Sequence, residues 1–158
     1  MDALRLLQQE HEQTSGLMRE IKGTFGQLDS SRRLKMFREL KHAVLLHAQV
    51  EELHVYPVFQ QSEITRDSAR QALDDHRLMK VQLEELDGMA VSGPSWVTKF
   101  NELYEAATRH MKMEEEDLFG HAAEVLTPQE AEELGTTIEV AKKEIRGEAP
   151  APAGGIPE

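Results

Sequence analysis

The chain has 158 residues, a formal net charge of −11 and no cysteine. This length suits one domain with a single hydrophobic core. Because phosphate binding needs a basic face, the negative charge argues against nucleic acid as a partner. The lack of cysteine excludes disulfides, thiolate zinc sites and cysteine catalysis.

Two further features concern the surface and the compartment. A basic cluster with helical spacing is typical of a solvated helix face; it comprises Arg32, Arg33, Lys35, Arg38 and Lys41. The sequence shows neither a signal-peptide-like stretch at its start nor an apolar run long enough to cross a bilayer. We therefore expect a cytoplasmic protein without a membrane partner.

Apolar residues recur with helical spacing along four segments, at about 4–21, 37–58, 69–86 and 100–118. Turn-forming residues separate these segments at 26–31, 62–65 and 92–95. Short connections between long helices favour antiparallel neighbours. The pattern predicts an all-α fold, an up-down-up-down antiparallel four-helix bundle.

Two prolines mark further boundaries. Pro57 should kink or end the second helix, because it removes one backbone hydrogen bond. Thr127 and Glu130 form a capping box around Pro128, which predicts an additional C-terminal helix from there to about Arg146, packed outside the bundle. We place one helical domain at 1–147 and a disordered, Pro/Gly/Ala-rich tail at 148–158.

One short pattern occurs twice, as His47-x3-Glu51 and His110-x3-Glu114. Residues four apart share one helix face, so each copy stacks an imidazole on a carboxylate. His11 and His76 lie on the apolar stripes of the other two helices. The midpoints between successive histidines fall in or beside the three chain breaks, which predicts that all four histidines lie at one level of the bundle.

This arrangement favours a metal site over a plain core. A single histidine on an apolar stripe is usually a hydrogen-bonded core residue. Here four histidines and two stacked glutamates would otherwise need six separate buried partners. Imidazole and carboxylate ligands without sulfur suit iron or manganese, and zinc remains an alternative. Two glutamates can bridge two ions, whose charge would compensate the buried carboxylates.

The motifs resemble the hemerythrin-like family, also described as the HHE cation-binding domain. The resemblance covers roughly 1–120 and rests on four segments: 9–12, 47–57, 75–76 and 110–119. It implies a non-haem centre of two iron ions with an oxo or hydroxo bridge. In this sequence it implies the nitrogen ligands His11, His47, His76 and His110 and the bridging carboxylates Glu51 and Glu114.

The sequence departs from the oxygen-carrying members of that family. The carriers place two histidines four residues apart on the third helix, whereas Ala72 and Lys80 flank His76 here. They also have an aspartate five residues after the last histidine, where this chain has Glu115. The pattern is more similar to the branch with four histidines and two glutamates, which includes iron-centre repair proteins and iron or oxygen sensors.

Several nearby residues receive secondary interpretations. His54 is expected to face solvent or cap the kink at Pro57 rather than bind metal, and Tyr56 to pack in the core with a satisfied hydroxyl. Glu52 and Glu115 are expected to face solvent or to support the ligands. Met111 and Met113 are expected to pack, because a thioether suits softer ions.

The leading functional hypothesis is a di-iron protein that binds, senses or turns over a small molecule such as O2, NO or H2O2. A peroxidase-like, catalase-like or NO-related enzyme activity is left open, and no protein partner is indicated. The alternative is a non-catalytic iron-handling or iron-sensing module. A plain helical bundle with an incidental zinc is a third hypothesis.

Overall fold

The structure is a computed structural model that describes residues 1–27 and 30–147. Every regular element in these residues is helical, which confirms the all-α prediction. The α-helices are α1 (Ala3–Lys22), α2 (Ser31–Val50), α3 (Tyr56–Gln60), α4 (Arg66–Asp87), α5 (Pro94–Met113) and α6 (Pro128–Ile145). Two π-helical turns, η1 (Glu51–Val55) and η2 (Glu114–Leu118), and a 3-10 segment, η3 (Phe119–Glu124), complete the fold.

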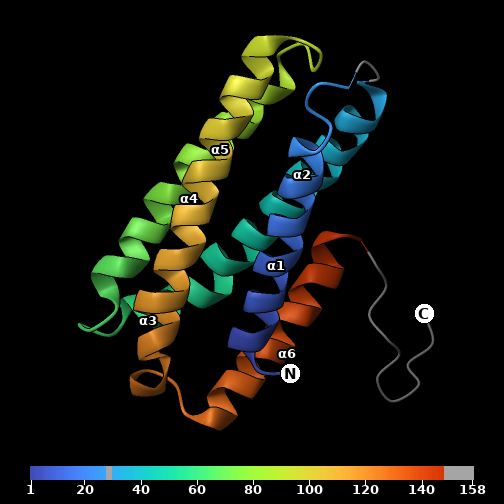
Figure 1. Cartoon of the computed structure of the whole chain (residues 1–158). Helices are drawn as coiled ribbons and strands as arrows, with labels where there is room; N and C mark the ends of the chain where they lie inside the picture. The colour runs from blue at the N-terminus through green and yellow to red at the C-terminus, as the bar shows by residue number, and fades with distance from the viewer. Residues whose placement is uncertain (28–29, 148–158) are drawn as a thin grey trace, which may run out of the picture.

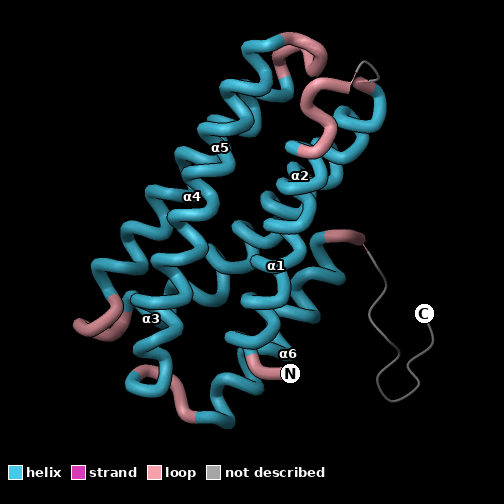
Figure 2. Tube along the Cα trace, viewed as in Figure 1, coloured by secondary structure: helices cyan, strands magenta, loops and turns pink. Residues whose placement is uncertain are grey.

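The long helices lie side by side in pairs (Figure 1). α1 packs mainly on α2, α4 packs mainly on α5, and α6 lies against α1 and α2. The connecting turns gather at the two ends of the molecule (Figure 2). None of the helices in the described part of the chain is long and apolar enough to span a membrane. The predicted tail at 148–158 lies outside the described residues.

Buried side chains form two separate hydrophobic clusters. One gathers around Tyr56, Phe59 and Leu118, towards the end of the molecule that carries α3. The other gathers around Phe37, Trp96 and Phe100, towards the opposite end. On α4 the two clusters reach Ala72 and Met79, and His76 lies between these residues. The polar level predicted from the histidine spacing therefore divides the core.

The helix type changes at each glutamate of the repeated pattern. α2 ends at Val50 and α5 ends at Met113, and each continues as a π-helical turn whose first residue is a glutamate. The sequence predicted that Pro57 would kink or end the second helix, but the helix already changes at Glu51, and Pro57 is the second residue of α3, after the π turn is complete. The matching position in the second copy is Gly120. Proline is therefore not the shared cause of the two π turns, which are common at functional sites.

The C-terminal helix begins as the sequence predicts. The Thr127 hydroxyl accepts a hydrogen bond from the Glu130 amide at 3.1 Å, and the Glu130 carboxylate accepts one from the Thr127 amide at 3.0 Å. This capping box satisfies two amides that would lack helical partners.

Arg33 departs from the predicted solvated basic face, because it is buried. Its guanidinium donates to the Thr24 carbonyl at 2.8 Å, to the Thr24 hydroxyl at 2.9 Å and to the Val91 carbonyl at 2.6 Å. A buried charge is tolerated when its hydrogen bonds are satisfied in this way. Arg33 thus connects the turns at the end of the molecule opposite α3.

Gly135 provides a test of how closely α6 docks on the N-terminus. A Cβ at this position would lie 2.2 Å from the Met1 carbonyl oxygen, whereas one at Gly16 in α1 would meet nothing within 4 Å. Inside a helix, glycine to alanine normally stabilises by about 0.5–1 kcal/mol. Gly16→Ala should do so, while Gly135→Ala should destabilise by about 1–3 kcal/mol through overpacking. Urea unfolding of both variants measures the difference, and equal stabilisation by both would contradict the close docking.

Candidate metal centre

The structure brings all six predicted site residues together in the core. His11, His47, His76 and His110 come from α1, α2, α4 and α5 respectively, one from each long helix. Glu51 and Glu114 are the first residues of the two π turns. Both glutamates are 0% exposed, and the histidines other than His47 are at most 5% exposed. His54 is only partly buried and lies outside this set.

The six side chains form two overlapping groups of four. One group contains His11 and His47, the other contains His76 and His110, and both contain Glu51 and Glu114. Within each group, one ligand atom per residue lies within 4.8 Å of every other. This is the arrangement expected for two cations that share two carboxylates.

Each glutamate contacts one histidine of each group. The Oε1 atom of Glu51 lies 2.9 Å from His47 Nε2 and 3.3 Å from His76 Nε2. The Glu114 oxygens lie 3.2 Å from His11 Nε2 and 3.5 Å from His110 Nε2. Both carboxylates therefore lie between the groups, which is where bridging ligands belong.

Several atoms of this cluster make no well-aligned hydrogen bond within the described residues, even where a carboxylate lies close: His11 Nε2, His47 Nε2, His110 Nε2, Glu51 Oε2 and Glu114 Oε1. Buried polar atoms are rarely left unsatisfied, because each costs about 1–3 kcal/mol. Here the unsatisfied atoms are nitrogen and oxygen atoms that could bind a metal ion, and they face one another. Their chemistry and burial fit divalent or trivalent cations held by imidazole and carboxylate.

The second ring nitrogen, Nδ1, of each of the four site histidines contacts a further carboxylate. The pairs are Glu10 with His47 (2.7 Å), Glu52 with His76 (2.8 Å), Asp75 with His110 (3.0 Å) and Glu115 with His11 (3.0 Å). We call these residues the outer carboxylates. Such a partner fixes the ring orientation of a ligating histidine and raises its basicity.

The outer carboxylates form a closed cycle around the centre. Each is the chain neighbour of one site residue but contacts the histidine of the next long helix. Glu10 of α1 reaches α2, Glu52 of η1 reaches α4, Asp75 of α4 reaches α5, and Glu115 of η2 returns to α1. The orientation of each histidine therefore depends on the helix before it in the cycle.

Two lysines extend this cycle outward. Lys142 of α6 contacts Glu10 at 2.5 Å, and Lys80 of α4 contacts Glu52 at 2.9 Å. Lys142 is only 17% exposed at its side chain, whereas Lys80 is 40% exposed. The contact of Lys142 is therefore the better shielded from solvent, and it joins α6 to His47 through Glu10.

Tyr56 is buried in the core with a satisfied hydroxyl, as expected, and the partners of that hydroxyl are residues of the centre. Its hydroxyl lies 3.1 Å from Glu51 Oε1 and 3.0 Å from His76 Nε2, and it also donates to Glu114 Oε2. The ring is fully buried. Burial raises the pKa of Tyr56 well above its usual value, and the charges of Glu51 and Glu114 act in the same direction. The hydroxyl thus keeps its proton while it contacts both glutamates.

Without a bound cation, the surroundings favour the protonated forms of His47 and His76. Burial alone would lower the pKa of His76, but hydrogen bonds to Glu51 and Glu52 raise it to about 9. Burial opposes the charged form of His47 too, yet the Glu51 charge raises its pKa well above the usual range. Burial would raise the pKa of Glu51, but the nearby His47 charge holds it well below normal. Metal ions and protons therefore compete for the same nitrogens.

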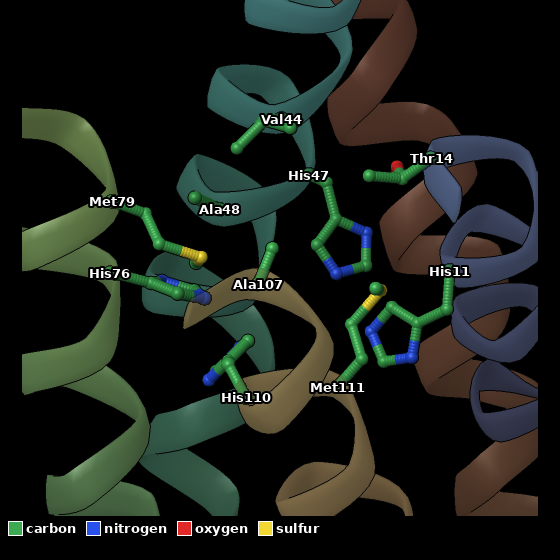
Figure 3. Close-up of a pocket in the computed structure, with 10 residues that line it drawn as sticks. All are labelled: His11, Thr14, Val44, His47, Ala48, His76, Met79, Ala107, His110 and Met111. Carbon is green, nitrogen blue, oxygen red and sulfur yellow. The ribbon is translucent and has the colours of Figure 1, made fainter. Parts of the chain in front are cut away.

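An apolar cavity adjoins the histidines. Its volume is about 30 Å³, and it is lined by all four site histidines and by Thr14, Val44, Ala48, Met79, Ala107 and Met111. Figure 3 shows Met111 beside His11 and Met79 beside His76. Neither glutamate lines the cavity. The centre thus presents its nitrogen side to a small, mainly hydrocarbon space.

Comparison with known proteins identifies the family. Residues 2–122 match the hemerythrin HHE cation-binding domain. The chain belongs to this family, as its motifs predict. The fold is similar to that of a hemerythrin HHE cation-binding domain-containing protein from Mycobacterium kansasii, with a TM-score of 0.81 and 26% identity over 93% of this chain and 88% of that chain. None of the curated proteins matches the sequence significantly.

Some residues of the centre were not assigned from the sequence. Glu10 and Asp75 each precede a site histidine directly, but adjacency alone does not reveal a contact across helices. Lys142 gave no signal at all. The expectation that Glu52 and Glu115 face solvent or support the ligands is resolved in favour of support.

Binding of a metal ion should release protons. His76, with a pKa of about 9, is protonated at neutral pH and must lose that proton before Nε2 can bind a cation. Apparent affinity for Co²⁺ should therefore rise from pH 6.5 towards pH 9 and then level off. Calorimetry in buffers of different ionisation enthalpy measures the protons released. A heat that does not depend on the buffer would contradict the predicted protonation.

Lys142 of α6 should support metal retention although it is not one of the candidate ligands. Lys142→Met removes the cation that holds Glu10 against His47, while Lys143→Met alters an exposed neighbour on the same helix. Loss of a direct hydrogen-bond partner of a ligand costs about 10–100-fold in metal affinity, so loss of this more distant contact should cost about 3–10-fold. Competition with a chromophoric chelator measures both variants. Equal affinity in both would show that α6 does not influence the centre.

Proposed function

We propose that this protein is a non-haem di-iron protein that binds a small neutral molecule such as O2, NO or H2O2. One observation carries the proposal: two groups of buried donor atoms share Glu51 and Glu114 and adjoin a cavity large enough only for a very small molecule. The six residues His11, His47, His76, His110, Glu51 and Glu114 would hold the ions.

The donor set supports iron. Imidazole nitrogens and carboxylate oxygens without sulfur suit first-row metals such as iron and manganese rather than soft ions. Two buried carboxylates would cost several kcal/mol each unless cations compensate them. Two ions, one for each group of donors, satisfy both the charge and the atoms that lack hydrogen bonds.

The cavity supports a neutral small molecule. A cavity of about 30 Å³ has room for a molecule of a few atoms. Hydrocarbon from Val44, Ala48 and Ala107 disfavours a hydrated anion. Bound iron would supply redox and Lewis-acid chemistry beside this space. The histidines would hold the ions, and the Tyr56 hydroxyl keeps a proton at the two glutamates.

We further propose that the fold is an antiparallel four-helix bundle of α1, α2, α4 and α5 with α6 packed outside. The short connections from α1 to α2 and from α4 to α5, and the packing of α1 with α2 and of α4 with α5, support this topology. The cycle of outer carboxylates fits this topology as well, because it links α1 to α2, η1 to α4, α4 to α5 and η2 back to α1.

Iron loading tests the main proposal. Protein purified with iron should contain two irons per chain and show near-ultraviolet charge-transfer absorption. Addition of NO to the reduced protein should change that spectrum. His47→Ala should lose iron and the absorption, while His54→Ala should keep both, because His54 lies outside the two groups. A folded protein that takes up no metal would overturn the proposal.

The alternative is a non-catalytic module whose fold responds to iron. The two buried glutamates favour this alternative, because their negative charges destabilise the fold unless cations compensate them. A chelator would then lower the thermal midpoint strongly, while O2, NO and H2O2 would leave the iron spectrum unchanged. The spectral response to the small molecules therefore separates the two functions.

A further inference from the structure

An open groove lies on the outside of the protein next to the internal cavity. Its volume is about 490 Å³, and α1 and α5 with η2 line it through His11, Glu12, Ser15, Arg19, Thr108, Met111, Lys112, Glu115 and Glu116. His11 and Met111 also line the internal cavity. These two side chains therefore form the wall between solvent and the centre.

The two parts of this wall differ in how firmly they are held. His11 contacts Glu115 through Nδ1 and Glu114 through Nε2. Met111 is an unbranched thioether at 9% exposure, and its three rotatable bonds let it change rotamer without breaking a polar contact. Figure 3 shows it beside His11, on the side of the cavity opposite Met79. Met111 is therefore the movable part of the wall.

The helix packing agrees with an opening at this seam. α1 packs mainly on α2 and α6, and α5 packs mainly on α4. α1 and α5 approach each other closely at few positions, as α2 and α4 do, but the outer groove that reaches the cavity lies between α1 and α5. Two further grooves in the described part of the chain are lined by residues of α1, α3, η3, α6 and the turns, and they share no lining residue with the cavity.

The charges of the groove suit a neutral visitor. Arg19 and Lys112 face the groove together with Glu12, Glu115 and Glu116. These two positive and three negative side chains nearly cancel, so the groove exerts only a weak net attraction on an ion of either sign. An uncharged molecule would pass these charged side chains and then enter the apolar cavity.

We propose that small molecules reach the centre through the groove between α1 and α5, and that Met111 sets the size of the molecule admitted. This inference rests on the proposed function, because it concerns the route to the same cavity. Met111 acts as a specificity-determining residue.

Association of NO with the reduced, iron-loaded protein tests the route. Met111→Ala should raise the bimolecular rate constant at least about tenfold, because it opens the wall, and Met111→Phe should lower it. Met79→Ala removes the same atoms from the opposite side of the cavity, so it should change the rate by less than about twofold. Stopped-flow absorbance measures all four proteins, after their iron content and thermal midpoints have been compared.

A second measurement needs no iron. In metal-free protein, H2O2 transfers one oxygen atom to a methionine sulfur and leaves water, forming the sulfoxide. Met111 should oxidise faster than Met79 and more slowly than Met1, which is 54% exposed. Mass spectrometry of the three peptides over time gives the order.

The outcomes separate the route from the function. Equal acceleration by Met111→Ala and Met79→Ala, or oxidation of Met79 as fast as Met111, would overturn the route. If NO binds to no variant although iron is present, the proposed function fails, and the order of sulfoxide formation alone decides the route.

Discussion

The structure depends on two glutamates placed where no water reaches them. Glu51 and Glu114 are 0% exposed and lie among four histidines in the middle of the protein. Buried carboxylates are costly unless positive charge compensates them. Without a metal ion, the raised pKa values of His47 and His76 favour protonated rings that provide such charge. With metal ions, the same nitrogens become donors. Protons and metal ions can therefore replace each other as the positive charge beside the two glutamates. The centre occupies the space between the two clusters of the hydrophobic core.

The outer carboxylates convert this cluster into a connected framework. Each one holds a histidine of the next long helix, so no histidine is oriented by its own helix alone. Lys142 brings α6 into the same framework through Glu10. The close approach of Gly135 to the N-terminus then gives α6 a defined position along α1. The position of α6 therefore affects two things: its packing on the N-terminus and, through Lys142 and Glu10, the orientation of His47 at the centre.

The sequence predicted most of the fold and the principal site residues, for reasons of periodicity. Helical spacing of apolar residues located the four long helices, and the capping box at Thr127 located the start of α6. Because His47 and Glu51 are four residues apart, they had to share a face. Equal distances from the turns then brought His11 and His76 to the same level as the repeated pattern. These features depend only on separations along the chain, which a sequence states directly.

Tertiary structure decided the contacts that depend on helix rotation and on distant segments. Lys142 is 132 residues away from Glu10, so no local pattern could connect them. The π turns rotate the chain at Glu51 and Glu114, and Tyr56 follows on the chain close enough to contact both carboxylates. Arg33 looked like part of a solvated face, but the neighbouring turns enclose it and accept its hydrogen bonds. The sequence by itself determined the helices and the level of the six site residues. Only the packed helices determined which side chains surround these six residues. A partner on another helix depends on how that helix is rotated and how far it is shifted along its axis, and separations along the chain do not specify either.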